Sequence, residues 1–117
     1  MIKTMTLTIV ALILMVSTGC GPTGPDIPPP PTGLTVTAAS PITLSWNSVA
    51  DVTGYNVYRG PVSGGITAKT LLASNVAVTN FADATATVVG TTYYYQVTAV
   101  NILGESGGSN EVTAVVQ

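Results

Sequence analysis

Side chains that carry chemistry are scarce in this sequence of 117 residues: histidine is absent, cysteine occurs once, and 7% of the residues are charged. Without histidine the chain lacks the most common general base of enzymes. It has three Lys and Arg residues in total, whereas nucleic-acid binding needs a cluster of positive charge. We therefore expect no nucleic-acid partner. Because no zinc-ligand spacing, phosphate-binding loop or dinucleotide fingerprint is present, we also expect no metal and no cofactor.

Threonine, valine, glycine and proline are abundant, which favours an all-β domain with many turns. Stretches of alternating or β-branched residues predict strands at 34–38, 42–46, 55–59, 67–73, 78–81, 91–101 and 110–116. The run 91–101 is the longest and contains no Gly or Pro. Its odd positions should face a core and its even positions a wetter surface. Seven short strands separated by turns predict an antiparallel sandwich.

The first twenty residues have the layout of a secretory signal peptide: Lys3, an apolar run at 7–16, and small residues up to Cys20. The apolar run is shorter than the roughly 20 residues of a membrane-spanning helix. Residues 16–20, Val-Ser-Thr-Gly-Cys, resemble a bacterial lipobox, with Ser17 where Leu is most usual. The resemblance implies a signal peptide at 1–19 and a lipidated Cys20.

A lipidated Cys20 would anchor the chain to a membrane of the bacterial cell envelope, with the remaining residues outside the cytoplasm. Two or more acyl chains hold a protein stably where one chain is marginal. Gly21 after the cysteine favours, by the same resemblance, export to the outer membrane or cell surface. The alternative is an ordinary signal peptide that leaves an unpaired thiol.

Proline dominates the segment that follows, and Pro28 to Pro31 form an unbroken run. Such a run favours extended polyproline II, at about 3.1 Å per residue. We expect residues 20–31 to be a tether that holds a domain about 30 Å from the membrane. A ligand for an SH3-like groove is the alternative.

Residues 32–117 resemble a fibronectin type III domain. The resemblance is carried by Trp46, by Gly-Tyr-Asn-Val-Tyr-Arg at 54–59, by Phe-Ala-Asp at 81–83, by Thr-Tyr-x-Tyr-x-Val-x-Ala-Val-Asn at 92–101, and by Gly-Glu-Ser at 104–106. It implies a seven-stranded immunoglobulin-like sandwich in which strands A, B and E face strands C, C′, F and G. It also implies that Tyr93 is the tyrosine corner, with its hydroxyl bonded to the backbone near the preceding turn.

The inward phase of the strands predicts a core. Trp46 shares its phase with Ile42 and Leu44, which favours a place between the sheets over the alternative of a ligand platform. The predicted core and structural residues are Trp46, Tyr55, Val57, Tyr93, Tyr95 and Val97.

Catalytic patterns in the sequence are incomplete. Ser106 lies in a G-x-S-x-G pattern, but it falls between two strands and has no histidine to take its proton, so we interpret it as part of a flexible turn. Asp51 and Glu105 should share one end of the sandwich, as a glycosidase pair or calcium site would require; we interpret them as solvated surface charge. The strand at 67–73 should lie at an edge of its sheet, where the charge of Lys69 would discourage unwanted pairing.

An aromatic and amide patch is the one surface hypothesis. Tyr58, Tyr94, Gln96 and Asn56 should lie on the outer face of neighbouring strands, where they would suit a glycan or a protein partner. Ordinary cross-strand packing is the alternative. We expect a non-catalytic, lipid-anchored cell-surface module that acts as a spacer, adhesion or protein-interaction element. A small glycan-binding module of the envelope is the second hypothesis, and an enzyme is the third.

Overall fold

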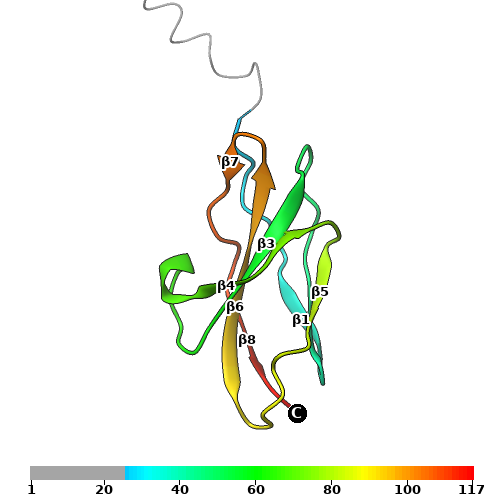
Figure 1. The fold of residues 1–117 in the computed structure, drawn as a ribbon, viewed down its shortest axis with the longest axis vertical. Coiled ribbons are helices and arrows are strands. Elements are labelled where there is room, and N and C mark those ends of the chain that lie inside the picture. The colour runs from blue at the N-terminus through cyan, green and yellow to red at the C-terminus, as the bar shows by residue number, and fades with distance from the viewer. Residues whose placement is uncertain (1–25) are drawn as a thin grey trace, which may run out of the picture.

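The computed structural model describes residues 26–117, which form two antiparallel sheets packed face to face (Figure 1). The smaller sheet has the order β1-β2-β5, with β1 at Thr35–Ala39, β2 at Ile42–Ser45 and β5 at Asn80–Asp83. The larger sheet has the order β4-β3-β6-β7, and β8 also pairs with β6. Its strands are β3 at Gly54–Gly60, β4 at Thr70–Val76, β6 at Thr92–Asn101, β7 at Gly104–Glu105 and β8 at Val112–Val115.

The predicted all-β sandwich and its division into two sheets are confirmed. The predicted strand boundaries shift in several places. Residues 66–68 form a 3-10 turn (η1, Ile66–Ala68), so β4 begins at Thr70 rather than at residue 67. The two-residue β7 is an addition to the seven predicted strands. In the part of the chain that the structure describes, no helix is long and apolar enough to cross a bilayer.

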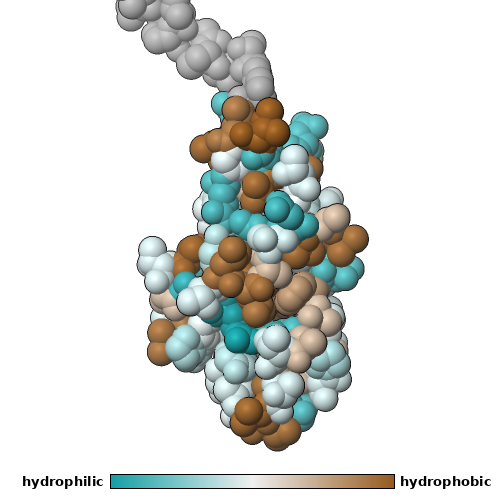
Figure 2. Space-filling model, in the orientation of Figure 1, coloured by the Kyte–Doolittle hydropathy of each residue, from teal (hydrophilic) through white to brown (hydrophobic). Residues whose placement is uncertain are grey.

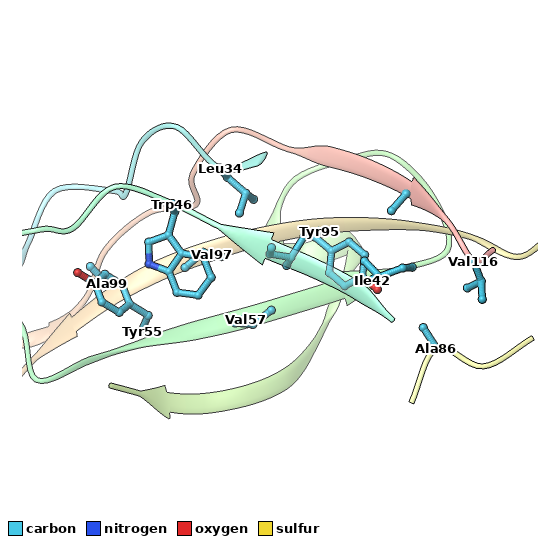
Figure 3. Close-up of a cluster of buried hydrophobic side chains, with 12 residues drawn as sticks. Leu34, Ile42, Trp46, Tyr55, Val57, Ala86, Tyr95, Val97, Ala99 and Val116 are labelled. Atoms are coloured by element: carbon cyan, nitrogen blue, oxygen red, sulfur yellow. The ribbon is translucent and has the colours of Figure 1, made fainter. Parts of the chain in front are cut away.

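The core lies between the sheets and is built from alternate residues of the long strands (Figure 3). On β6 the inward residues Tyr95, Val97 and Ala99 are fully buried. Trp46, just after β2, is 4% exposed and meets the ring of Tyr55 edge-on, with 5.5 Å between the ring centroids. Tyr93 is half-buried against this core. The indole therefore fills the space between the sheets and is not a surface platform.

The predicted signal peptide at 1–19 and Cys20 lie outside the described residues. The last part of the predicted tether does not behave as a free spacer. Pro28 and Pro31 are buried, and the side-chain amide of Asn101 donates to the carbonyl oxygen of Asp26 at 2.7 Å. The chain is therefore fixed to the domain from Asp26 onward, six residues before the predicted boundary.

Candidate functional site

The four residues of the predicted patch lie on neighbouring strands, but they do not form a free platform. In the register of β3 and β6, Asn56 is opposite Thr98, Tyr58 is opposite Gln96, and Gly60 is opposite Tyr94. Tyr58 and Tyr94 are both half-buried. They are diagonal to one another across the two strands, rather than directly paired.

Glu105 engages two of these patch residues. One of its carboxylate oxygens accepts hydrogen bonds from the side-chain amide of Asn56 at 3.0 Å, from the hydroxyl of Thr98 at 2.6 Å and from the hydroxyl of Tyr58. Partial burial acts to raise the pKa of Glu105, but these hydrogen bonds outweigh it and the pKa is lowered. Burial and the neighbouring carboxylate both raise the pKa of Tyr58. Glu105 is exposed, as predicted, but its carboxylate is also a structural acceptor on the outer face of the sheet.

Gln96 does not belong to the surface, so the prediction that it is part of an exposed patch is wrong. It is 9% exposed, and its side-chain amide donates to the carbonyl oxygen of Ser109 at 2.7 Å. Gly108 lies directly over it, because a Cβ built on Gly108 would come within 2.8 Å of the Gln96 amide nitrogen. A larger residue at position 108 would have to displace the side chains of Gln96 and Ile66. The even face of β6 is thus covered, rather than wet as expected.

The serine of the G-x-S-x-G pattern fixes the covering segment to β6. The hydroxyl oxygen of Ser106 accepts from the backbone N–H of Ala99 at 2.8 Å, and that of Ser109 accepts from Val97 at 3.0 Å. Both serines are buried. Residues 106–109, which we call the cover segment, therefore satisfy the edge of β6 between β7 and β8. Ser106 has a structural role there, and the segment is not the flexible turn that the sequence predicted.

A buried ion pair holds the β3–β4 loop, residues 61–69. The Lys69 ammonium contacts a carboxylate oxygen of Glu111 and the carbonyl oxygen of Gly64, both at 2.5 Å, and its side chain is fully buried. Glu111 also accepts from the Ser63 hydroxyl and the Gly64 N–H. The Lys69 ammonium is the main cause of a lowered pKa at Glu111. The strand β4 lies at the edge of its sheet, as predicted, but Lys69 precedes it and is a buried clasp, so the prediction that its charge discourages pairing there is wrong.

Asp83 is the centre of a second polar cluster, at the end of β5. Its carboxylate, 1% exposed, accepts from the Arg59 guanidinium at 2.8 Å, from the Tyr95 hydroxyl at 2.6 Å and from the backbone and hydroxyl of Thr85. Burial acts to raise the pKa of Asp83, but the bonds from Thr85, Tyr95 and Arg59 outweigh it and the pKa is lowered. Burial, followed by the bond to Asp83, raises the pKa of Tyr95. The cluster joins the two sheets.

This cluster also corrects the tyrosine-corner expectation. The hydroxyl that reaches the end of β5 is that of Tyr95, and its acceptor is a side chain rather than the backbone. The Arg59 guanidinium lies over the Tyr93 ring, 4.4 Å from its centroid. Tyr93 therefore contributes a ring face to the cluster. A cation over an aromatic ring in a partly buried setting adds to the stability of such a cluster.

A shallow groove at the end of the sandwich where residue 26 lies contains Asp51, which the sequence suggested as a partner of Glu105. It has a volume of about 460 Å³ and is lined by Asp26, Pro28, Pro29, Val49, Ala50, Asp51, Asn101 and Ile102. Asp51 is in this groove, whereas Glu105 is turned toward Tyr58. The two carboxylates are therefore not brought together as a catalytic pair. Within residues 26–117, no group of three potential metal ligands is present.

Sequence reasoning missed the roles of Asp83, Glu111 and Lys69. Asp83 lies in the Phe-Ala-Asp motif at 81–83, which is part of the resemblance to fibronectin type III domains. That motif does not show that the partner of Asp83 is Arg59. Lys69 and Glu111 are separated by 42 residues and have no shared motif. The sequence contains one weak signal for these pairs. Only 7% of the residues are charged, so a charged residue inside a predicted strand is expected to have a partner of opposite charge.

Two antiparallel sheets closing over a tryptophan, with the first, second and fifth strands facing the rest, define an immunoglobulin-like sandwich. The fibronectin type III domain model matches residues 29–115, and the chain belongs to that family. Among solved structures, an Fn3-like protein from Clostridium thermocellum is 35% identical, with a TM-score of 0.67 over 79% of this chain and 96% of that one. Pectate lyase PelI from Erwinia chrysanthemi is 30% identical, with a TM-score of 0.61 over 72% of this chain and 28% of that one.

Curated relatives carry the domain within much longer enzymes. An amylopullulanase from Thermoanaerobacterium thermosulfurigenes is 42% identical over 95 residues, which are 78% of this chain and 5% of that protein. A poly(3-hydroxybutyrate) depolymerase from Ralstonia pickettii is 41% identical over 91 residues, which are 74% of this chain and 16% of that protein. The chain therefore matches an accessory segment of these enzymes.

Proposed function

We propose that this chain is a non-catalytic, lipid-anchored module of the bacterial cell envelope. Its domain acts by contact, as a spacer, adhesion or protein-interaction element. The observation that carries the proposal is the use of its ionisable side chains. Arg59 pairs with Asp83, Lys69 pairs with Glu111, and Glu105 is held by three hydrogen bonds. These five side chains are thus committed to holding the sandwich together, whereas Asp26 and Asp51 line the groove.

The relatives support a contact role, because the same domain is a small share of enzymes from several bacteria. A fold of this kind does not itself imply an activity, because function resides in the sites that a fold displays. The lipobox-like residues 16–20 supply the second part of the proposal, the anchor at Cys20.

The anchor is tested by fractionation of cells that express the full chain. Cys20→Ala removes the acylated residue, so the protein should move from the membrane fraction to the soluble fraction or remain unprocessed. Ser17→Leu restores the more usual lipobox residue and is the matched control, which should stay in the membrane fraction. Membrane retention of Cys20→Ala equal to that of the wild type would rule out the lipid anchor.

Glycan binding is a second candidate, favoured by the amylopullulanase relatives and by the half-exposed ring of Tyr94. Aromatic rings on a sheet face suit a sugar ring. Affinity gels that contain pullulan test it: Tyr94→Ala should lose retardation, whereas Tyr58→Phe, which removes only the hydroxyl bonded to Glu105, should keep it. Migration of the wild type that is unchanged by the polysaccharide would argue against this candidate.

A further inference from the structure

Three apolar side chains gather at the end of the sandwich where residue 26 lies. Ile27 is 55% exposed, Ile102 is 88% exposed and Leu103 is 48% exposed. We call these three residues the apolar tip. Figure 2 shows a hydrophobic cap at that end, over the β6–β7 turn of Figure 1. The tip combines two segments of the chain, because the Ile27 side chain lies 3.8 Å from a Cβ built on Gly104.

The tip is held in place by hydrogen bonds of Asn101. Its side-chain oxygen accepts from the backbone N–H of Leu103 at 2.8 Å and of Gly104 at 3.2 Å. Its side-chain nitrogen donates to the carbonyl oxygen of Asp26 at 2.7 Å. One residue therefore fixes both the turn that presents Ile102 and Leu103 and the segment that presents Ile27. The exposure of these apolar side chains is thus built into the fold and is not the result of a loose loop.

The length of chain between Cys20 and Asp26 limits how far the tip can be from the anchor. Six residue steps span at most about 20 Å, even when fully extended. This is shorter than the roughly 30 Å that a free tether to Pro31 would allow. Since the domain is fixed from Asp26 onward, its first residues, including Ile27, are close to Cys20 along the chain, and Ile102 and Leu103 belong to the same end of the sandwich.

We propose that the apolar tip rests in the interfacial layer of the membrane to which Cys20 is anchored. This inference rests on the proposed lipid anchor. Apolar side chains gain free energy when they enter the boundary between headgroups and acyl chains. A short tether raises the effective concentration of the tip at the surface, so a small apolar contact suffices. The β6–β7 turn is then the part of the domain that contacts the membrane.

The charges near the tip show what kind of contact this is. Asp26 and Asp51 line the adjoining groove, and the cations Arg59 and Lys69 are ion-paired elsewhere. The tip therefore lacks the basic residues that attract a protein to anionic lipids. Contact is driven by apolar burial and tethering, and we expect that added salt does not weaken it.

Depth-dependent fluorescence quenching tests the proposal on the full, membrane-extracted chain. Ile102→Cys is labelled with an environment-sensitive maleimide dye and reconstituted into vesicles of phosphatidylethanolamine and phosphatidylglycerol that carry a nitroxide high on the acyl chain. The matched control is Val89→Cys, which is 71% exposed in the β5–β6 loop at the opposite end of the sandwich (Figure 1). The wild-type chain is treated with the dye in parallel, because an acylated Cys20 has no free thiol to react.

The dye at position 102 should shift its emission to shorter wavelength and lose intensity to the nitroxide, in low and high salt alike, whereas the dye at position 89 should not. Adding Leu103→Ser to Ile102→Cys should weaken the quenching. Equal, weak quenching at both positions in a chain that floats with the vesicles would overturn the tip inference and leave the anchor intact. A dye-reactive Cys20 in a wild-type chain that does not float would overturn both.

Discussion

The middle of β6 is buried on both faces, but the two faces are covered in different ways. The inner face, with Tyr95, Val97 and Ala99, packs against the smaller sheet. On the outer face Gln96 is 9% exposed and Thr98 is 1% exposed, yet what covers them is the polar cover segment and Glu105. The inner face depends mainly on apolar area, and the outer face on hydrogen bonds. The comparison shows that a sheet face in a chain with few charges can be closed without a second apolar layer.

Truncation of the core tryptophan should give the largest effect, because it breaks the inner face. Trp46→Ala should lower the free energy of unfolding by roughly 3–5 kcal/mol, through lost burial and the cavity left behind. Urea titration followed by far-UV circular dichroism measures it. Trp46→Phe, which keeps an apolar ring, is the control and should cost less. A loss below about 1 kcal/mol for Trp46→Ala would show that the indole is not a core residue.

The next effect should come from the cluster that joins the sheets. Asp83→Asn leaves Arg59 without its counter-charge and weakens the bond to Tyr95, which should cost about 2–3 kcal/mol. The exposed Asp51→Asn is the control and should be near neutral. The difference is measured at neutral pH by urea titration. Equal costs for the two variants would contradict the role of Asp83.

The dependence of stability on pH is a second test of the role of Asp83. The pKa of Asp83 is lowered in the folded state, so its contribution is present above the ordinary carboxylate pKa of about 4 and is lost as pH falls through the folded value. Wild-type stability should therefore decline in acid more steeply than that of Asp83→Asn. Parallel pH profiles of the two proteins, measured by thermal unfolding, would contradict a lowered pKa at Asp83.

The clasp of the β3–β4 loop should give a similar or smaller loss. Glu111→Gln leaves the buried ammonium of Lys69 without a counter-charge and should cost about 2 kcal/mol. Lys69→Met with Glu111→Gln removes the buried charge as well, so the double variant should be at least as stable as Glu111→Gln alone. A double-mutant cycle by urea titration measures the coupling. A coupling energy near zero would show that the pair does not hold the loop.

The smallest of these effects should be at Glu105 on the outer face. Glu105→Gln keeps the shape of the side chain but removes its charge, and should cost about 1 kcal/mol. The pKa of Tyr58 should fall in the variant, because the neighbouring carboxylate is one cause of its rise. Ultraviolet titration of the tyrosines measures the shift, with Glu111→Gln as a matched charge-loss control. An unchanged tyrosine titration would contradict the link between Glu105 and Tyr58.

The sequence predicted the inner face of β6 well and the outer face poorly. The alternation of Tyr93, Tyr95, Val97 and Ala99 records which side is inward, because a strand has a period of two. The cover segment leaves no such record, since Gly108 and Ser109 are typical of any turn. Their position over Gln96 depends on tertiary hydrogen bonds, which have no periodicity.

Long-range polar pairs were the other part that the sequence did not contain. Lys69 lies in a stretch that resembles a strand, which suggested a charge at the edge of a sheet. Its burial depends instead on the carboxylate of Glu111, 42 residues away. The predicted patch was incomplete for the same reason: Tyr58 and Asn56 were placed on the correct face, but the hydrogen bonds that Glu105 accepts from them were not predicted. The placement of strands was predictable, whereas the partners of polar side chains were not.

The most direct test of the proposed function is the mass of the mature chain purified from membranes, with its N-terminal peptide sequenced by mass spectrometry. A lipid-anchored envelope module should begin at Cys20 and carry the added mass of glyceride-linked acyl chains on that residue. A mature chain that begins elsewhere, or that has an unmodified Cys20, would contradict the anchor and the contact with the membrane that depends on it.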